Sequence, residues 1–213
     1  MEIAKAAAGL FVSRGLRATR AEDIAQAAGI APRTFYRYFA TKEEAVAPLY
    51  AAGAQRWAEA VREAPAELSV PEALEHAVRH TLTPGAGVSA ASWEWVRTLI
   101  RLADSSPALG KVWAEVCRDS ERVLGEVLAE RVAREPHRTD NVAAPVDSVA
   151  TVDSVATVVA AELRFAAAVA SAAVRTAVEA WVAGDARASG PGGPAELALR
   201  NLGVLEGFPW EAG

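Results

Sequence analysis

The stretch Ala18–Lys42 reads Ala-Thr-Arg-Ala-Glu-Asp-Ile-Ala-Gln-Ala-Ala-Gly-Ile-Ala-Pro-Arg-Thr-Phe-Tyr-Arg-Tyr-Phe-Ala-Thr-Lys. Gly29 and Pro32 predict a tight turn between two short helices, because glycine ends a helix in the left-handed conformation and proline suits the first position of the next. The second helix carries arginine and tyrosine beside inward-facing Phe35 and Phe39. This pattern predicts a helix-turn-helix, whose second helix lies in the major groove of DNA.

The same reading extends helices over the rest of the chain. A serine or threonine three residues before a glutamate forms a capping box, and three such pairs mark helix starts at Thr19, Thr41 and Ser69. Apolar residues recur at helical spacing, and no alternating strand pattern occurs, so we expect an all-α fold. The predicted helices cover residues 3–15, 19–29, 32–39, 41–64, 69–82, 92–103, 106–135, 158–182 and 195–205.

Two segments between these helices have an unusual composition. Residues 135–146 form a polar loop marked by prolines, and the sequence Val-Asp-Ser-Val-Ala-Thr at 146–151 recurs at 152–157. Two copies of six residues are too few for a repeat protein, so we interpret them as a local duplication that lengthens a loop or a helix start.

The composition favours a globular protein of the reducing cytoplasm. Hydrophobic residues make up 52% of the 213 residues, which permits a sizeable core, and the single cysteine excludes an internal disulfide framework. No signal peptide pattern is visible, and the longest charge-free apolar run near the C-terminus, Phe165–Val174, is too short to span a bilayer.

Charge is distributed unevenly along the chain. Residues 1–46 contain seven basic and five acidic side chains, a net charge of +2, whereas the remainder has a net charge of −7. A basic head on an acidic body fits a nucleic-acid reader with a separate regulatory body, although a charge of +2 is also compatible with random scatter.

The predicted DNA contacts lie on the third helix and at the starts of its neighbours. Arginine can pair with guanine through two hydrogen bonds, whereas tyrosine and threonine hydroxyls suit phosphate oxygens. For Tyr36 and Tyr38, surface or interface packing is the alternative. The full set is Thr19, Arg20, Arg33, Thr34, Tyr36, Arg37, Tyr38 and Lys42.

Residues 3–46 resemble the N-terminal domain of TetR-type (tetracycline repressor family) transcriptional regulators. The resemblance rests on an ordered run of motifs: Leu10-Phe11, Gly15, Ala18-Thr19, Asp23-Ile24-Ala25, Ala28-Gly29-Ile30, Thr34-Phe35-Tyr36-Arg37-Tyr38-Phe39 and Thr41-Lys42-Glu43. It implies the same eight DNA contacts, an all-helical body, a homodimer and a small ligand that ends DNA binding. The implied division is a helix-turn-helix domain over residues 1–46 and a ligand-binding and dimerisation domain over residues 47–213.

The chain departs from the family pattern at two places. Ala31 stands where the family often has a serine, and the loss of that helix cap costs ~1 kcal/mol of local stability. Almost nothing precedes Ile3, where the family usually has a basic segment, so this chain either is shortened or lacks an N-terminal arm.

Six residues of the body are predicted to line a pocket for a small hydrophobic ligand: Trp93, Arg97, Trp113, Cys117, Arg164 and Phe165. Tryptophan walls and one or two arginines would suit a flat or acyl ligand with an acidic or carbonyl group. The alternative is that the tryptophans are ordinary core residues. Cys117 could also act as a thiol sensor, which would need exposure and a lowered pKa.

His76 and His80 are four residues apart with Glu72 one turn earlier, a spacing that can bind a metal. The pattern lacks a clear third ligand, and pocket-lining or solvated histidines are the alternative. We therefore predict neither a metal nor a cofactor.

The helices at 158–182 and 195–205 are the expected dimer surface, because a helix-turn-helix reader needs two heads one DNA turn apart. The alternative is that the first of them is an intrachain core helix. The sequence thus predicts a cytoplasmic, ligand-responsive regulator, most simply a repressor, that binds a pseudo-palindromic operator as a homodimer. A ligand-independent DNA-binding protein is a second possibility. A small-molecule enzyme is a third, but no catalytic motif supports it.

Overall fold

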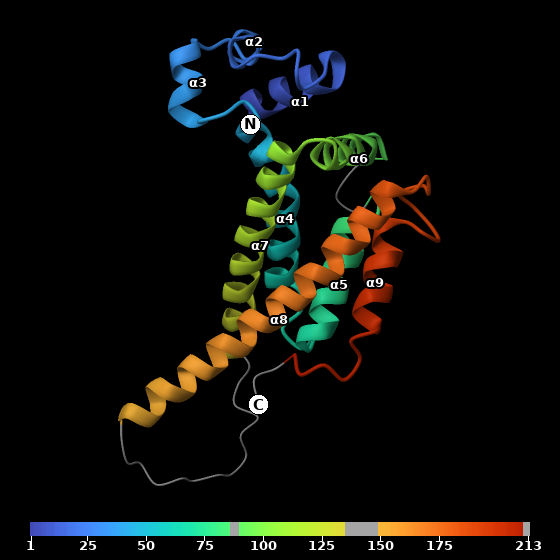
Figure 1. The fold of residues 1–213 in the computed structure, drawn as a ribbon. Helices are drawn as coiled ribbons and strands as arrows, with labels where there is room; N and C mark the ends of the chain where they lie inside the picture. Colours follow the sequence, from blue (N-terminus) through green and yellow to red (C-terminus); the bar gives the residue numbers. More distant parts are fainter. Residues whose placement is uncertain (86–89, 135–148, 211–213) are drawn as a thin grey trace. The chain divides into compact units, whose positions relative to one another are not determined.

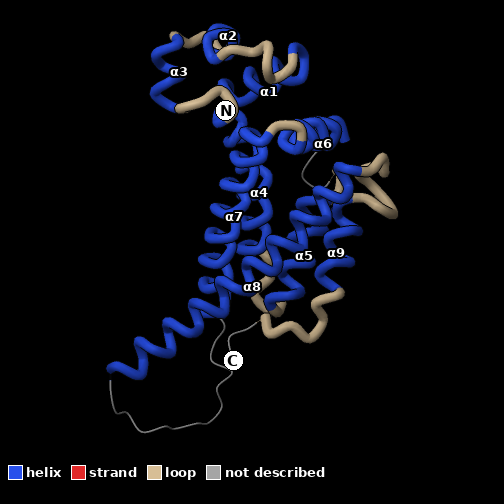
Figure 2. The backbone as a smooth tube through the Cα atoms, viewed as in Figure 1, coloured by secondary structure: helices blue, strands red, loops and turns tan. Residues whose placement is uncertain are grey.

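The computed structural model describes residues 1–85, 90–134 and 149–210, with backbone alone at 90–92 and 149–156. Every regular element in these ranges is a helix (Figure 2), which confirms the predicted all-α class. In chain order the elements are α1 (Glu2–Arg14), α2 (Ala21–Ala27), α3 (Pro32–Tyr38), the 3₁₀ turn η1 (Glu44–Val46), α4 (Ala47–Glu63), α5 (Val70–Leu82), α6 (Ala90–Asp104), α7 (Pro107–Arg134), α8 (Val149–Ala183) and α9 (Pro194–Gly203).

The chain forms two compact units, each with its own core. The first unit comprises Met1–Arg56 and Ser89–Arg118, and the second comprises Trp57–Val88 and Asp119–Gly213. Helices α4 and α7 contribute residues to both. The predicted domain boundary after residue 46 stays a prediction, because these units describe packing rather than function.

The first unit packs α1, α2 and α3 around a small aromatic and aliphatic core (Figure 1). Phe11 of α1, Ile24 of α2 and Phe35 of α3 are almost fully buried, and Val46 of η1 joins them. Phe39 is partly buried, and its ring centroid lies 5.5 Å from that of Phe35. The inward placement predicted for both phenylalanines is therefore confirmed, and it directs the intervening side chains of α3 outward.

The turn before α3 follows the rules that predicted it. Gly29 has a φ of 69°, which glycine adopts without the steric cost of a Cβ atom. Pro32 occupies the first turn of α3, and Ala31 precedes it as an N-cap residue without a side-chain hydrogen bond. The helix therefore starts through backbone geometry alone.

The start of α2 differs from the prediction. Thr19 does not cap the helix, because its hydroxyl donates to the carbonyl oxygens of Gly15 at 2.9 Å and Leu10 at 3.3 Å. Arg20 is the N-cap residue, and its backbone N–H donates to the Asp23 carboxylate at 2.8 Å. Asp23 therefore caps α2 in place of the expected Glu22, because Thr19 is buried against the end of α1 and cannot act as the N-cap residue.

The start of the fourth helix is tighter than predicted. The Thr41 hydroxyl accepts a hydrogen bond from the Glu44 N–H at 3.3 Å, as a capping box requires. The Glu44 carboxylate instead reaches the N–H of Ala40 at 2.8 Å, and the chain forms η1 before α4 begins.

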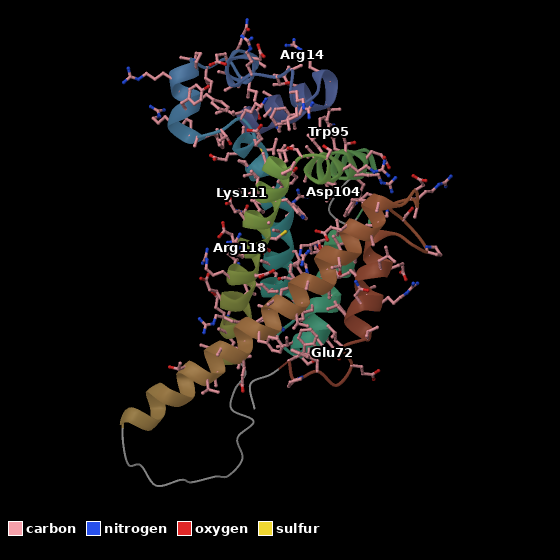
Figure 3. All side chains as sticks on the ribbon, viewed as in Figure 1. Arg14, Glu72, Trp95, Asp104, Lys111 and Arg118 are labelled. Carbon is pink, nitrogen blue, oxygen red and sulfur yellow. The ribbon has the colours of Figure 1, made fainter. Side chains whose placement is uncertain are left out.

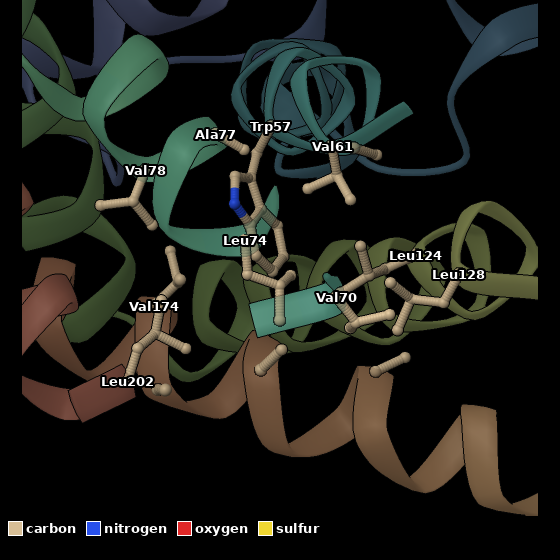
Figure 4. Close-up of a cluster of buried hydrophobic side chains, with 14 of the residues drawn as sticks. Trp57, Val61, Val70, Leu74, Ala77, Val78, Leu124, Leu128, Val174 and Leu202 are labelled. Atoms are coloured by element: carbon tan, nitrogen blue, oxygen red, sulfur yellow. The ribbon is translucent and has the colours of Figure 1, made fainter. Parts of the chain in front are cut away.

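The second unit is built around the C-terminal parts of α4 and α7 together with α5, α8 and α9. Figure 4 shows side chains from these helices converging, with Trp57, Leu74 and Leu128 among them. Helix α8 contributes mainly alanines, whose small side chains permit close packing. A Cβ atom at Gly125 of α7 would lie only 3.7 Å from Ala167 of α8.

A buried arginine ties α7 to the end of α4. The Arg131 guanidinium donates to four carbonyl oxygens, those of Val61, Ala64, Pro65 and Leu68, at 2.8–3.2 Å. These carbonyls belong to the last turn of α4 and the loop that follows, where a helix has no partners of its own for them. Arg131 thus neutralises the negative end of the helix and closes the loop to α5.

Two further helix starts test the sequence reading. At α5 the Ser69 N–H and hydroxyl both donate to the Glu72 carboxylate, at 2.9 and 2.7 Å, which confirms this cap. These bonds lower the pKa of Glu72. Helix α8 begins at Val149, nine residues before the predicted start at 158, so the second copy of the hexapeptide is helical. Residues 146–148 of the first copy lie outside the described residues.

The charge-free run Phe165–Val174 is part of a longer apolar segment of α8. The α8 segment Thr157–Ala183 is long and apolar enough to span a bilayer, although core helices of soluble proteins pass the same test. Leu163, Ala167 and Ala170 of this segment are buried within the second unit. Arg164 and Arg175 bound the charge-free run, so that run is shorter than the apolar segment that contains it.

Candidate nucleic-acid interface

Helix α3 presents a polar surface over a buried phenylalanine. Phe35 is fully buried, whereas Tyr36 and Tyr38 are 52% and 60% exposed. An open hollow of about 630 Å³ lies on this surface, lined by Ala31, Arg33, Thr34, Tyr36 and Arg37. Four predicted DNA contacts line this hollow, and Tyr38 is the fifth that lies on α3.

Arg37 and Tyr38 form a pair. The Arg37 Nη2 donates to the Tyr38 hydroxyl oxygen at 3.0 Å, and its guanidinium carbon lies 5.0 Å from the centre of the Tyr38 ring. The contact fixes two long side chains with respect to each other before any ligand binds. Because Arg37 is the donor, the Tyr38 hydroxyl keeps its own hydrogen for another acceptor.

Tyr36 has a different partner. Its hydroxyl donates to the Glu22 carboxylate of α2 at 3.3 Å. Partial burial, together with the charge and the hydrogen bond of Glu22, raises the pKa of the Tyr36 phenol. The phenol therefore stays protonated at neutral pH and links α2 to α3.

Four further arginines from α1 to α3 are exposed: Arg14, Arg17, Arg20 and Arg33. None of them forms an ion pair with another described residue. Arg14 lies at the end of α1 (Figure 3) and Arg17 in the following loop, and sequence reasoning did not assign either as a contact. Their signal was available, since one is the last residue of α1 and the other is a basic residue of the loop that leads into α2.

Two predicted DNA contacts, Thr19 and Lys42, make hydrogen bonds within the chain. Thr19 is fully buried, so its hydroxyl does not reach the surface where a phosphate would lie. The Lys42 ammonium donates to the carbonyl oxygens of Leu16 and Thr19 at 2.7 and 2.8 Å. Both side chains hold the α1–α2 loop against the segment before η1, because unpaired carbonyls there need donors. Of these two side chains, only that of Lys42 is partly exposed and can still reach a phosphate.

Four of the predicted ligand-binding residues belong to the first unit. Trp93 is buried, and the Arg97 side chain is only 11% exposed and lies 3.8 Å from the Glu94 carboxylate. Trp113 and Cys117 are half-buried, and the Trp113 ring packs edge-on against Tyr50 with centroids 5.2 Å apart. Burial raises the pKa of Tyr50, whose hydroxyl donates to the Leu99 carbonyl at 2.9 Å.

The other two, Arg164 and Phe165, belong to α8 in the second unit. Both are exposed, and the Phe165 ring lies 5.6 Å from Phe208 in the segment that follows α9. A ring that is 61% exposed does not wall an enclosed cavity. The apolar side of α8 that faces the core is lined by alanines instead, which is why the larger Phe165 lies outside.

The histidine pair of α5 is on the surface. His76 and His80 are exposed, and their rings are nearly parallel with centroids 6.4 Å apart. The neighbouring Glu72 is occupied by Ser69. Among the residues with described side chains, no group of three metal-binding side chains occurs.

Comparison with known proteins adds to this geometry. Residues 3–47 match the family model described as bacterial regulatory proteins, tetR family. A stretch of 45 residues is 51% identical to the HTH-type transcriptional repressor KstR2 of Mycobacterium tuberculosis, covering 21% of this chain and 22% of KstR2. A longer match, 29% identical over 136 residues, relates 63% of this chain to 59% of the HTH-type transcriptional regulator TcmR of Streptomyces glaucescens. The chain therefore spans less than two thirds of each relative.

The fold has a known counterpart over nearly its whole length. The crystal structure of Thermus thermophilus FadR, a TetR-family transcriptional repressor in complex with lauroyl-CoA, superposes with a TM-score of 0.57 at 22% identity. The match covers 96% of this chain and 92% of FadR. Residues 3–47 thus match the tetR family of bacterial regulatory proteins, and the fold as a whole is similar to that of a TetR-family repressor.

Proposed function

We propose that this chain is a cytoplasmic transcriptional regulator, most simply a repressor, that binds a pseudo-palindromic DNA operator as a homodimer. One observation carries the proposal: α3 buries Phe35 and exposes Arg33, Tyr36, Arg37 and Tyr38 on its other sides. An exposed aromatic and guanidinium surface on the second helix of a helix-turn-helix fits a major groove.

The proposed contacts divide by chemistry. Arg33 and Arg37 read base edges, because a guanidinium can donate two hydrogen bonds to guanine. Tyr38 donates to a phosphate through the hydrogen that Arg37 leaves free. Arg20 is joined by Arg14 and Arg17 as phosphate contacts, since all three are exposed without a described ion pair. Thr34 stays in the set because it lines the hollow on α3.

The homodimer is proposed through α8 and α9. Helix α8 exposes Val158 and Phe165, and Val204 after α9 is 79% exposed. A contiguous exposed apolar patch marks an interaction surface, so we expect these side chains to meet the partner. A two-fold dimer would place the two α3 helices about 34–36 Å apart, one DNA turn.

A small hydrophobic ligand is proposed to end DNA binding. It would bind the helical body and would act only through a higher affinity for the form that cannot bind DNA, because equal affinity for both forms shifts nothing. Trp93, Arg97, Trp113 and Cys117 remain the proposed lining. The lauroyl-CoA in the FadR complex makes acyl-CoA the first class to test.

Selection from a pool of random DNA duplexes tests the proposal. The purified full chain should enrich duplexes with two related half-sites, and their footprint should cover both. The double variant Arg33→Ala and Arg37→Ala should abolish enrichment. Replacement of Arg122, an exposed side chain of α7, by alanine should not. Addition of acyl-CoA should then release the selected duplex. Failure to enrich any sequence would refute the DNA-binding proposal.

A further inference from the structure

The hydroxyl groups of Tyr36 and Tyr38 differ in what they can still donate. Each phenol has a single hydrogen. Tyr36 gives its hydrogen to the Glu22 carboxylate at 3.3 Å, whereas Tyr38 accepts from Arg37 and keeps its hydrogen. A phosphate oxygen is only an acceptor, so it can bind Tyr36 only by displacing Glu22.

Glu22 also differs from the other acids of this region in where its charge lies. The Asp23 carboxylate accepts from the Arg20 N–H and that of Glu44 accepts from the Ala40 N–H, so both are turned toward the backbone. Glu22 is exposed in the first turn of α2 and contacts Tyr36, one of the residues that line the hollow on α3. It therefore brings a negative charge to the surface on which Arg33 and Arg37 lie.

A carboxylate at such a surface has a predictable effect on DNA binding. It repels phosphates of every sequence alike, and the repulsion is strongest at low salt. Contacts between arginine and base edges are not weakened in the same way, because they depend on the base. Such a charge lowers non-specific binding and leaves more of the affinity to base reading.

We propose that Glu22 is a specificity-determining residue that holds the Tyr36 hydroxyl away from phosphate and limits the affinity of this chain for DNA of any sequence. The inference rests on the proposed function, because it needs α3 to face DNA. Tyr36 then donates to phosphate only when Glu22 is displaced, whereas Tyr38 can donate to phosphate without losing a partner.

The experiment compares four variants of the full chain by fluorescence anisotropy with a random-sequence duplex of about 30 base pairs, three turns of DNA. Glu22→Gln keeps an acceptor for Tyr36 but removes the charge, and Glu22→Ala removes both. Tyr36→Phe removes the hydroxyl in the original chain and in the Glu22→Ala background. Glu63→Gln, an exposed acid of α4 without a described ion pair, is the matched control for net charge.

Glu22→Gln should raise the affinity for this duplex about three- to tenfold at low salt, whereas Glu63→Gln should change it less than about twofold. Tyr36→Phe should cost less than about twofold in the original chain but about threefold or more in the Glu22→Ala background, where the hydroxyl is released. Equal affinities for Glu22→Gln and the original chain would overturn the proposal. So would a loss confined to the selected duplex, which would make Glu22 a base reader. If the original chain binds no duplex at all, the proposed function itself fails; if it binds and Glu22→Gln changes nothing, only this inference fails.

Discussion

Replacing Arg131 by methionine should strongly destabilise the second unit. Methionine keeps an apolar stem of similar length but removes all four hydrogen bonds to the end of α4 and its loop. The carbonyls of Val61 and Ala64 lie in buried surroundings, and an orphaned buried acceptor costs ~1–3 kcal/mol. The carbonyls of Pro65 and Leu68 are partly buried, and water can replace part of what they lose.

The net magnitude is smaller than the sum of the bonds, because burying a guanidinium itself costs desolvation free energy. We expect the free energy of unfolding to fall by about 3–5 kcal/mol, as for breaking other buried charged contacts. For a chain of this size the melting temperature should fall by roughly 6–20 °C. The stability of Arg131→Lys should lie between those of the original chain and Arg131→Met, since an ammonium keeps the charge but lacks the forked donors.

Urea unfolding followed by tryptophan fluorescence measures this effect, because Trp57 is buried in the second unit. Arg122→Met is the matched control: Arg122 is an exposed arginine of the same helix, paired with Glu126 at 2.6 Å. It should change the stability by less than ~1 kcal/mol. The reasoning is refuted if Arg131→Met is no more destabilising than Arg122→Met.

Three further changes test other parts of the account. Arg37→Ala should weaken binding to the selected duplex by ~1–3 kcal/mol and relax the choice of base at one position, measured by anisotropy on single-base variants; unchanged preference would remove Arg37 from base reading. Gly125→Val should destabilise the chain by ~1–3 kcal/mol in thermal unfolding, because branched atoms must enter the 3.7 Å approach to Ala167, whereas Gly125→Ala should be tolerated; equal stability of both variants would contradict this packing. Glu72→Gln should lower the melting temperature at neutral pH and lose its effect in acid: the pKa of Glu72 is lowered by folding, so the stabilisation is present above the ordinary value of 4.5 and disappears as the pH falls through the folded-state pKa. An effect that persists at low pH would exclude the Ser69 contact as its cause.

The sequence predicted those features that depend on neighbouring residues. Gly29 and Pro32 located the turn before α3, and Ser69 with Glu72 located the start of α5, because each signal is complete within four residues. Phe35 and Phe39 followed from helical spacing.

The failures arose where tertiary contacts decided. Thr19 had the pattern of a cap, yet it is buried and its hydroxyl bonds to Gly15 and Leu10 instead. The contacts of Lys42 with Leu16 and Thr19 could not be predicted, because these partners lie 26 and 23 residues away, whereas its proposed contact with phosphate stays a prediction. No local pattern could assign Arg131, whose four carbonyl partners are 63–70 residues distant.

The central claim, that the outer surface of α3 meets DNA, is tested most directly by the salt dependence of duplex binding. Between about 50 and 200 mM salt, the affinity of the full chain for the duplex should fall steeply. In a plot of log affinity against log salt concentration, each lost phosphate contact should make the slope shallower by about 0.9. Arg14→Ala with Arg17→Ala should lower that slope by about 2 for each head in contact with the duplex, and Arg122→Ala should leave it unchanged. A flat salt curve for the original chain, or a slope that is unchanged by the replacement of Arg14 and Arg17, would contradict the account.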